Sequence, residues 1–218
     1  MTPINTQVKA IVTDVYNTVL VTDARPREPY LTLLEALAVK DPRATLHADR
    51  AILLAQKTTL EAYAAKYAPD DLSEERFQQI ITNAEDLLQK HHDAYRVRAE
   101  WPEFLILLHH YNLKLSFCSN LAQPFTQNVH EKFPEVATKI YSCECGLVKP
   151  QPEIFQLCAD EMGVKPEEII MIGDSFASDI TGAKQAGFAN AYWMNKGQGL
   201  NSLTDVFPMM RREKLLSL

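Results

Sequence analysis

The pattern of hydrophobic and polar positions divides the chain into two kinds of segment. Residues Val8–Thr13 form a short apolar run, which is typical of a strand buried on both faces of a parallel sheet. Residues 21–100 show almost only helical spacing of apolar positions, and Ser73 followed by two glutamates supplies a helix start. Helices are expected here near residues 28–39, 48–66 and 73–95. The first part of the chain therefore predicts one strand followed by an all-helical segment.

After residue 102, short strand patterns alternate with helical patterns. Strands are expected at Leu113–Cys118, Lys139–Ser142, Ile169–Ile172 and Ala189–Met194. Helices are expected at Glu103–Tyr111, Gln123–Phe133, Pro152–Met162 and Ser178–Ala186. This alternation predicts an α/β fold, a Rossmann-like parallel sheet with helices on both faces, to which the strand at 8–13 also belongs. We expect a core domain of residues 1–20 plus 101–218 and an inserted helical domain of residues 21–100.

Composition and charge restrict the partners of such a protein. Its 218 residues carry 22 basic and 28 acidic side chains, and the net charge of −6 argues against a surface for nucleic acid or an anionic membrane. No apolar run approaches the roughly 18 residues of a membrane span. The first residues lack the basic and then apolar pattern of a secretory signal. We expect a cytoplasmic protein that is a monomer or a homodimer.

Polar side chains stand where the chain leaves each predicted strand. They are Asp14 and Thr18 after the first strand, Ser119 and Asn120 after the second, Lys149 after the third, and Asp174 and Asp179 after the fourth. In an open parallel sheet, ligands bind outside the carboxyl ends of the strands, so these side chains are expected to converge. Carboxylates are ligands that Mg²⁺ prefers, lysine and hydroxyl groups can hold a phosphate, and a carboxylate can act as a nucleophile.

In these residues the sequence resembles the haloacid dehalogenase (HAD) superfamily. The four motifs read Asp14-Val15-Tyr16-Asn17-Thr18, Ser119 in CSN, Lys149 in GLVKP, and GDSFASD with Asp174 and Asp179. Their order along the chain and their common position at strand ends make the match specific. The helical segment between the first two motifs resembles the type-one cap of this superfamily. A small substrate is implied, because a cap that closes over the strand ends excludes water and large partners.

The resemblance also implies a role for each site residue. Asp14 would attack phosphorus as the nucleophile and form an aspartyl-phosphate, which water then hydrolyses. The cofactor Mg²⁺ would be held by Asp14, the backbone carbonyl of Tyr16 and Asp174, with Asp179 in support. Lys149 would neutralise charge between Asp14 and the transferred group. The phosphoryl oxygens would be bound by Thr18, Ser119, Asn120 and Lys149.

Two adjacent residues of the first motif depart from the phosphatases of the superfamily. Those phosphatases carry a second Asp as general acid and base where this chain has Tyr16, whereas the haloalkanoate dehalogenases carry Tyr. A Tyr with an ordinary pKa of about 10 is a poor base, and loss of a general acid–base group typically costs about 10²–10⁴ in rate. Asn17 replaces the usual Gly and is the residue most able to adopt a positive φ in its place.

Three functions are therefore open. The intact Gly173-Asp174 and Asp179 favour Mg²⁺-dependent hydrolysis of a small phosphorylated metabolite, with Tyr16 as a candidate catalytic residue. Tyr16 alone favours a metal-independent 2-haloacid dehalogenase. The altered first motif also allows a catalytically weak or inactive HAD-like binding protein. The pairs His91-His92 and His109-His110 are expected on helix surfaces, with no part in catalysis.

Overall fold

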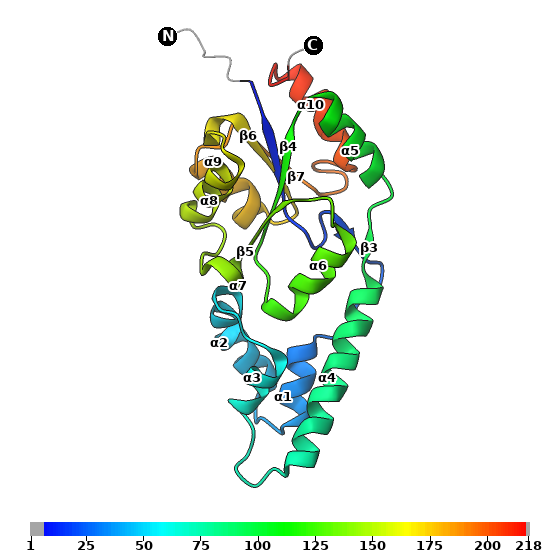
Figure 1. The fold of residues 1–218 in the computed structure, drawn as a ribbon, viewed down its shortest axis with the longest axis vertical. Helices are drawn as coiled ribbons and strands as arrows, with labels where there is room; N and C mark the ends of the chain where they lie inside the picture. Colours follow the sequence, from blue (N-terminus) through cyan, green and yellow to red (C-terminus); the bar gives the residue numbers. More distant parts are fainter. Residues whose placement is uncertain (1–6, 217–218) are drawn as a thin grey trace.

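A parallel sheet forms the centre of the computed structural model, which describes residues 7–216 (Figure 1). Its strands are β1 Ala10–Thr13, β4 Lys114–Ser119, β5 Thr138–Tyr141, β6 Ile169–Gly173 and β7 Asn190–Trp193. They lie in the order β5-β4-β1-β6-β7, and every neighbouring pair is parallel. The expected α/β fold with a parallel sheet is confirmed. Because β1 lies between β4 and β6, the motifs that follow these three strands emerge side by side.

Helices cover both faces of the sheet, as Figure 1 shows. One face carries α5 Trp101–His110, α6 Thr126–Lys132 and α10 Val206–Arg212, and the other carries α8 Pro152–Met162 and α9 Gly182–Gln185. Side chains alternate along the strands, so Ile11 and Phe117 pack with the first group while Val12 and Cys118 pack with the second. The sheet is therefore buried on both faces, as its nearly continuous apolar strands require.

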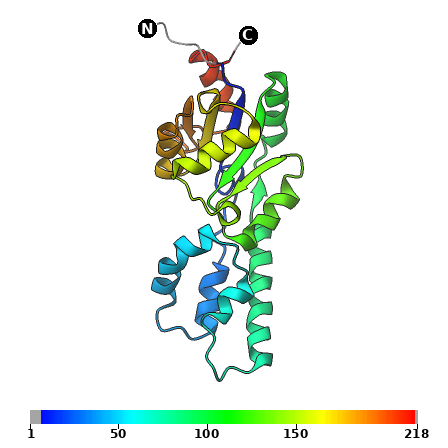
Figure 2. The ribbon, with the colours of Figure 1, turned by 60° about the vertical axis from the view of Figure 1, so that its left-hand side comes forward.

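A helical segment lies beyond the carboxyl ends of the strands (Figure 2). It contains α1 Pro29–Ala36, α2 Pro42–Ala55, α3 Leu60–Ala65 and α4 Glu74–Ala94, which we call the cap helices. The chain enters and leaves this segment through a short antiparallel ribbon of β2 Leu20–Val21 and β3 Arg96–Val97, in which Leu20 pairs with Val97. The two connections between the cap helices and the sheet therefore run together.

Several expected elements have different bounds in the structure. The single helix expected at 48–66 is two helices, because the backbone is extended at Gln56 and the Thr59 hydroxyl caps the start of α3. The helix expected at 178–186 begins instead as the π-helix η3 Phe176–Thr181 and continues as α9. The short helix α7 Ser142–Cys145 follows β5, and 3₁₀ turns occupy η1 Gln123–Phe125, η2 Pro166–Glu168 and η4 Leu203–Asp205.

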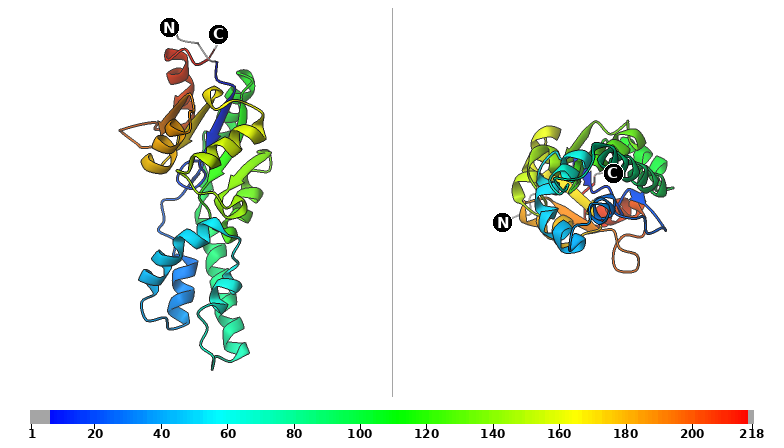
Figure 3. Two further views of the ribbon diagram at one scale, coloured as in Figure 1. Left: turned by 90° about the vertical axis from the view of Figure 1, so that its left-hand side faces the viewer. Right: turned by 90° about the horizontal axis from the view of Figure 1, so that it is seen from below.

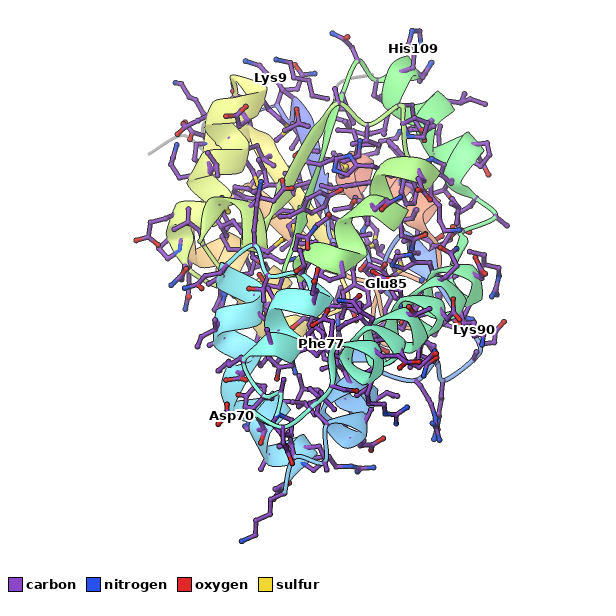
Figure 4. All side chains as sticks on the ribbon, turned by 60° about the horizontal axis from the view of Figure 1, so that its bottom comes forward. Lys9, Asp70, Phe77, Glu85, Lys90 and His109 are labelled. Carbon is purple, nitrogen blue, oxygen red and sulfur yellow. The ribbon has the colours of Figure 1, made fainter. Side chains whose placement is uncertain are left out.

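The cap helices contact the sheet domain through α2 and α4, among other elements. Helix α2 packs against α7, and α4 packs against η1. The view from below in Figure 3 looks onto the cap helices in front of the sheet. Figure 4 labels Phe77, Glu85 and Lys90 along α4 and His109 at the top of the view. Within residues 7–216, no helix combines the length and the apolar character needed to cross a membrane.

Candidate active site

A cavity of about 890 Å³ lies between the carboxyl ends of the strands and the cap helices. Its sheet side carries most of the motif residues predicted from the sequence. They are Asp14, Tyr16, Ser119, Asn120, Lys149, Asp174 and Asp179. Its cap side is formed by α1, α2 and the carboxyl-terminal end of α4. Residues separated by more than 160 positions in the sequence thus share one space, as expected from the topology.

Lys149 occupies the centre of the polar side of the cavity. Its Nζ donates to Asp14 Oδ1 at 2.8 Å, to Asp179 Oδ1 at 2.6 Å and to the Cys118 carbonyl at 2.6 Å. Only 3% of the residue is exposed. Burial by itself would lower the pKa of Lys149, but the two carboxylates outweigh it and raise the pKa above its ordinary value. Lys149 therefore carries a positive charge between the two acids at neutral pH.

Asp179 is held from two sides by the turn that follows β6. Its Oδ2 accepts the backbone N–H of Ser175 at 2.9 Å, while its Oδ1 accepts from Lys149. The π-helix η3 brings this carboxyl against Gly173, where a Cβ atom would lie 2.2 Å from Asp179 Oδ2. Any side chain at residue 173 would displace the carboxylate, so glycine is required there by steric contact.

The site contains the donor set for a divalent cation. Carboxylate oxygens of Asp14, Asp174 and Asp179 lie within 4.8 Å of one another. Burial and the charges of Asp14 and Asp179 raise the pKa of Asp174 to about 6, against opposing effects of Asn17 and Lys149. Three such acids near one lysine leave an excess of negative charge. A hard cation with oxygen ligands fits this arrangement and would relieve the repulsion.

The ring of Tyr16 faces the cap and not Lys149. The ring packs edge-on against Tyr95 at 4.7 Å between centroids and near His91, and its hydroxyl accepts from Asn128 Nδ2 at 3.1 Å. Burial raises the pKa of Tyr16 to about 12, although the Asn128 hydrogen bond opposes this. A phenol with such a pKa exchanges protons poorly at neutral pH, so its packing role is the better supported one.

The residue after Tyr16 adopts the conformation expected of a glycine replacement. Asn17 has φ of 62°, in the left-handed region that asparagine enters more easily than other side chains. Asparagine was expected to be the best substitute for glycine if this position has a positive φ, and it does have one. The substitution of Asn for Gly thus preserves the sharp turn that brings Asp14 to the cavity.

The three polar residues proposed for phosphate binding besides Lys149 have different surroundings. Ser119 lines the cavity, and its hydroxyl makes no hydrogen bond within residues 7–216. Asn120 instead donates its Nδ2 to the Lys149 carbonyl and accepts the Lys149 N–H on its Oδ1, both at 2.8 Å, so its amide positions Lys149. Thr18 does not line the cavity, and its Oγ1 is buried without a partner in the described part of the chain.

The cap contributes cavity residues that the sequence did not identify. His91 was expected on a helix surface, but it lines the cavity, and burial followed by the effect of His92 lowers its pKa to about 4. Tyr95 lies beside it on the same wall. The other side chains that cap elements contribute are Glu28, Tyr30, Leu31, Arg43, Leu46, His47, Arg50, Leu53 and Leu54. His109 and His110 are exposed, as expected.

Arg98 connects the ribbon behind the cap helices to the first motif. Its Nε donates to the Thr18 carbonyl at 2.5 Å and its Nη2 to the Asn17 carbonyl at 3.5 Å. The Arg98 N–H also donates to the Val19 carbonyl at 3.1 Å, and Glu100 lies 3.6 Å from the guanidinium. One partly buried guanidinium therefore binds consecutive carbonyls of the turn that contains Asn17.

Arg98→Met should lower the free energy of unfolding by about 2 kcal/mol, because hydrogen bonds to a charged group are lost from a largely buried turn. Arg96→Met is the matched control, since Arg96 pairs with Asp23 on the same ribbon but both side chains are mostly exposed. Urea unfolding of the two variants measures the difference. Equal stabilities would show that Arg98 does not hold the turn.

Comparison with known proteins places this site in a wider context. A segment of 70 residues is 36% identical to N-acylneuraminate-9-phosphatase of Rattus norvegicus, covering 32% of this chain and 28% of that protein. The chain thus matches less than a third of that relative's length.

Solved structures share the fold over nearly the whole chain. A 2-haloacid dehalogenase from Pseudomonas syringae pv. Tomato DC3000 superposes with a TM-score of 0.68 at 18% identity, covering 95% of this chain and 100% of that one. A HAD family enzyme from Bacteroides thetaiotaomicron, in complex with magnesium and inorganic phosphate, gives a TM-score of 0.60 at 16% identity, covering 88% and 96%. A family model of haloacid dehalogenase-like hydrolases matches residues 8–187. With most of its length matched by that model, the chain belongs to the haloacid dehalogenase-like hydrolases.

Proposed function

We propose that this hydrolase cleaves a small phosphomonoester with the help of Mg²⁺, through an aspartyl-phosphate on Asp14. The observation that carries the proposal is the cluster of Asp14, Asp174 and Asp179 carboxylates around one lysine. Without a metal, the negative Asp174 would repel Asp14 at close range, and a bound divalent cation removes that repulsion. The similarity to a phosphatase and the fold shared with an enzyme that binds magnesium and phosphate support the same choice.

Asp14 has the surroundings of a nucleophile. Lys149 holds Oδ1, while Oδ2 makes no hydrogen bond within residues 7–216 and belongs to a residue that lines the cavity. In the first step an Asp14 oxygen forms a bond to phosphorus, and the bond to the leaving oxygen breaks with its electron pair. That oxygen takes a proton and departs as an alcohol. Water then attacks the same phosphorus, which releases phosphate and restores the carboxylate.

Mg²⁺ would be held by Asp14, the Tyr16 carbonyl and Asp174, with Asp179 in support. When bound, it supplies positive charge to phosphoryl oxygens. Lys149 supplies a second fixed charge on the same side, and Asn120 keeps it there through the paired hydrogen bonds to its backbone. Ser119 offers a free hydroxyl to a phosphoryl oxygen. Catalysis in such a site is largely positioning and electrostatic stabilisation.

The leaving oxygen needs a proton, and this need restricts which esters can react quickly. Tyr16 has a pKa of about 12 and its hydroxyl contacts Asn128, so it replaces the usual acid poorly. We therefore expect faster turnover of esters whose leaving groups need no protonation. Residues 21–100 would serve as a type-one cap that shields the cavity from water, with residues 1–20 and 101–218 as the catalytic core.

Phosphate release from aryl and alkyl phosphomonoesters, with and without chelator, tests the function. We expect release that requires Mg²⁺, is lost on chelation and is absent from an Asp14→Asn control. Tyr16 is the one observation that favours a 2-haloacid dehalogenase, so halide release from 2-haloacids is measured in parallel. Halide release that survives chelation would replace the proposal. Neither product above the Asp14→Asn level would indicate a binding protein.

A further inference from the structure

One face of helix α2 carries basic side chains into the cavity. Arg43, His47 and Arg50 follow one another at intervals of four and three residues, which places them on the same side of the helix. All three line the cavity on the wall formed by the cap helices. Among the described cavity residues, arginine occurs only on this helix.

These charges have no internal partner that explains them. Neither arginine forms an ion pair with a carboxylate within residues 7–216. Arg43 also stands in the first turn of α2, where the helix dipole disfavours a cation and where the N-cap Asp41 is committed to the Ala44 N–H. Burial raises the pKa of Glu28, the nearby charge of Arg50 only opposes this shift, and the two side chains form no ion pair. The side chains are exposed at the cavity and free to meet a ligand.

The cavity is large enough for a ligand that reaches from the carboxylates to α2. Its volume of about 890 Å³ lies at the upper end for pockets that hold whole small molecules, far more than one phosphoryl group needs. Apolar side chains also line the cavity, with Leu46, Leu53 and Leu54 on α2 and Phe125 from the sheet domain. A ligand with charge at both ends and an uncharged middle matches this distribution.

We propose that Arg43, His47 and Arg50 form a subsite for a second anionic group of the substrate. This inference rests on the proposed function, in which the strand-end cluster takes the phosphoryl group. The substrate class is then a phosphomonoester that carries a carboxylate or a second phosphate at its far end. The two guanidinium groups can bind either a carboxylate or a phosphate through paired hydrogen bonds, and the His47 imidazole adds an N–H donor.

Three matched phosphate esters test the subsite. Glycerol 3-phosphate has an uncharged tail, 3-phosphoglycerate has a carboxylate there, and 1,3-propanediol bisphosphate has a second phosphate. The proteins are the wild type, Arg43→Gln/Arg50→Gln, and the charge-matched control Arg76→Gln/Arg211→Gln, whose arginines are exposed and do not line the cavity. Two readouts are taken: kcat/KM for phosphate release, and calorimetric affinity of each ester for Asp14→Asn versions of the three proteins with Mg²⁺.

We expect the wild type to prefer at least one two-anion ester over glycerol 3-phosphate by about tenfold or more, as charge-assisted hydrogen bonds give. The Arg43→Gln/Arg50→Gln protein should lose that preference and the Arg76→Gln/Arg211→Gln protein should keep it. The ester with the larger preference identifies the anion. The subsite proposal is overturned if the wild type does not prefer a two-anion ester over glycerol 3-phosphate. It is also overturned if the Arg43→Gln/Arg50→Gln protein keeps that preference. If no ester releases phosphate above the Asp14→Asn level, the proposed function fails, and the calorimetric ratios still decide the subsite.

Discussion

Replacing Lys149 with methionine should lower the free energy of unfolding by about 3–5 kcal/mol and abolish most phosphate release. Removing one member of a buried ion pair leaves uncompensated charge in a poorly solvated place. Without Lys149, the charges of Asp14 and Asp179 would repel each other and that of Asp174. Carboxylate oxygens of all three residues lie within 4.8 Å of one another. The catalytic loss should reach at least about 10²-fold, comparable to removal of one preorganised group that stabilises transition-state charge.

Urea unfolding of Lys149→Met in chelator and in Mg²⁺ measures the effect. A bound cation should restore part of the stability, since it replaces the missing positive charge. Lys66→Met is a suitable control, because Lys66 pairs with Asp49 but is half exposed, and we expect little change. If Lys149→Met unfolds at the same urea concentration as the wild type, the buried lysine does not balance these acids.

Replacing Tyr16 with aspartate should raise phosphate release from alkyl esters by about 10²–10⁴-fold, the usual contribution of a general acid–base group. The new carboxyl would stand at the position of a ring that contacts Tyr95 and Phe125. Such partly apolar surroundings raise the pKa of a carboxyl, which helps it to hold and deliver a proton near neutral pH. Aryl esters with good leaving groups should gain much less.

The variant Tyr16→Asn distinguishes proton transfer by the new carboxyl from the change in cavity shape that follows loss of the ring. It removes the same ring contacts and the hydrogen bond from Asn128, and it has nearly the size of aspartate. The rates of both variants are measured on one alkyl and one aryl ester. An equal gain in the two variants would assign the effect to space in the cavity. A Tyr16→Asp protein no faster than the wild type on alkyl esters would mean that Tyr16 is not the missing acid's position.

The sheet could be predicted from the sequence because its signals are local. Helix α8 has the expected bounds, with a proline at its start and Gly163 in the left-handed conformation after its end. The break between α2 and α3 could not be predicted in the same way. Apolar spacing continues through Gln56, whereas the structure has an extended backbone there, at the end of a helix that contacts α7. The strands β2 and β3 contain two residues each, too few to show a period.

The candidate site shows the same division. Asp14, Lys149 and Asp174 could be predicted because each follows its own strand, and the order of strands in a parallel sheet brings them together. His91 and Arg43 lie on helices whose placement over the sheet is decided by long-range packing. Asn120 looked like a ligand-binding amide, but only the structure reveals that both of its amide atoms hold Lys149.

The antiparallel pairing of Leu20 with Val97 has a consequence for how such proteins diversify. Chain entry and exit of the cap helices are neighbours, so the whole segment between them forms a cassette inserted at one point of the sheet. We expect that lengthening, shortening or exchanging that cassette leaves the strand order and the loops that carry Asp14, Lys149 and Asp174 in place. Substrate range and chemical machinery can therefore evolve at separate rates within one chain.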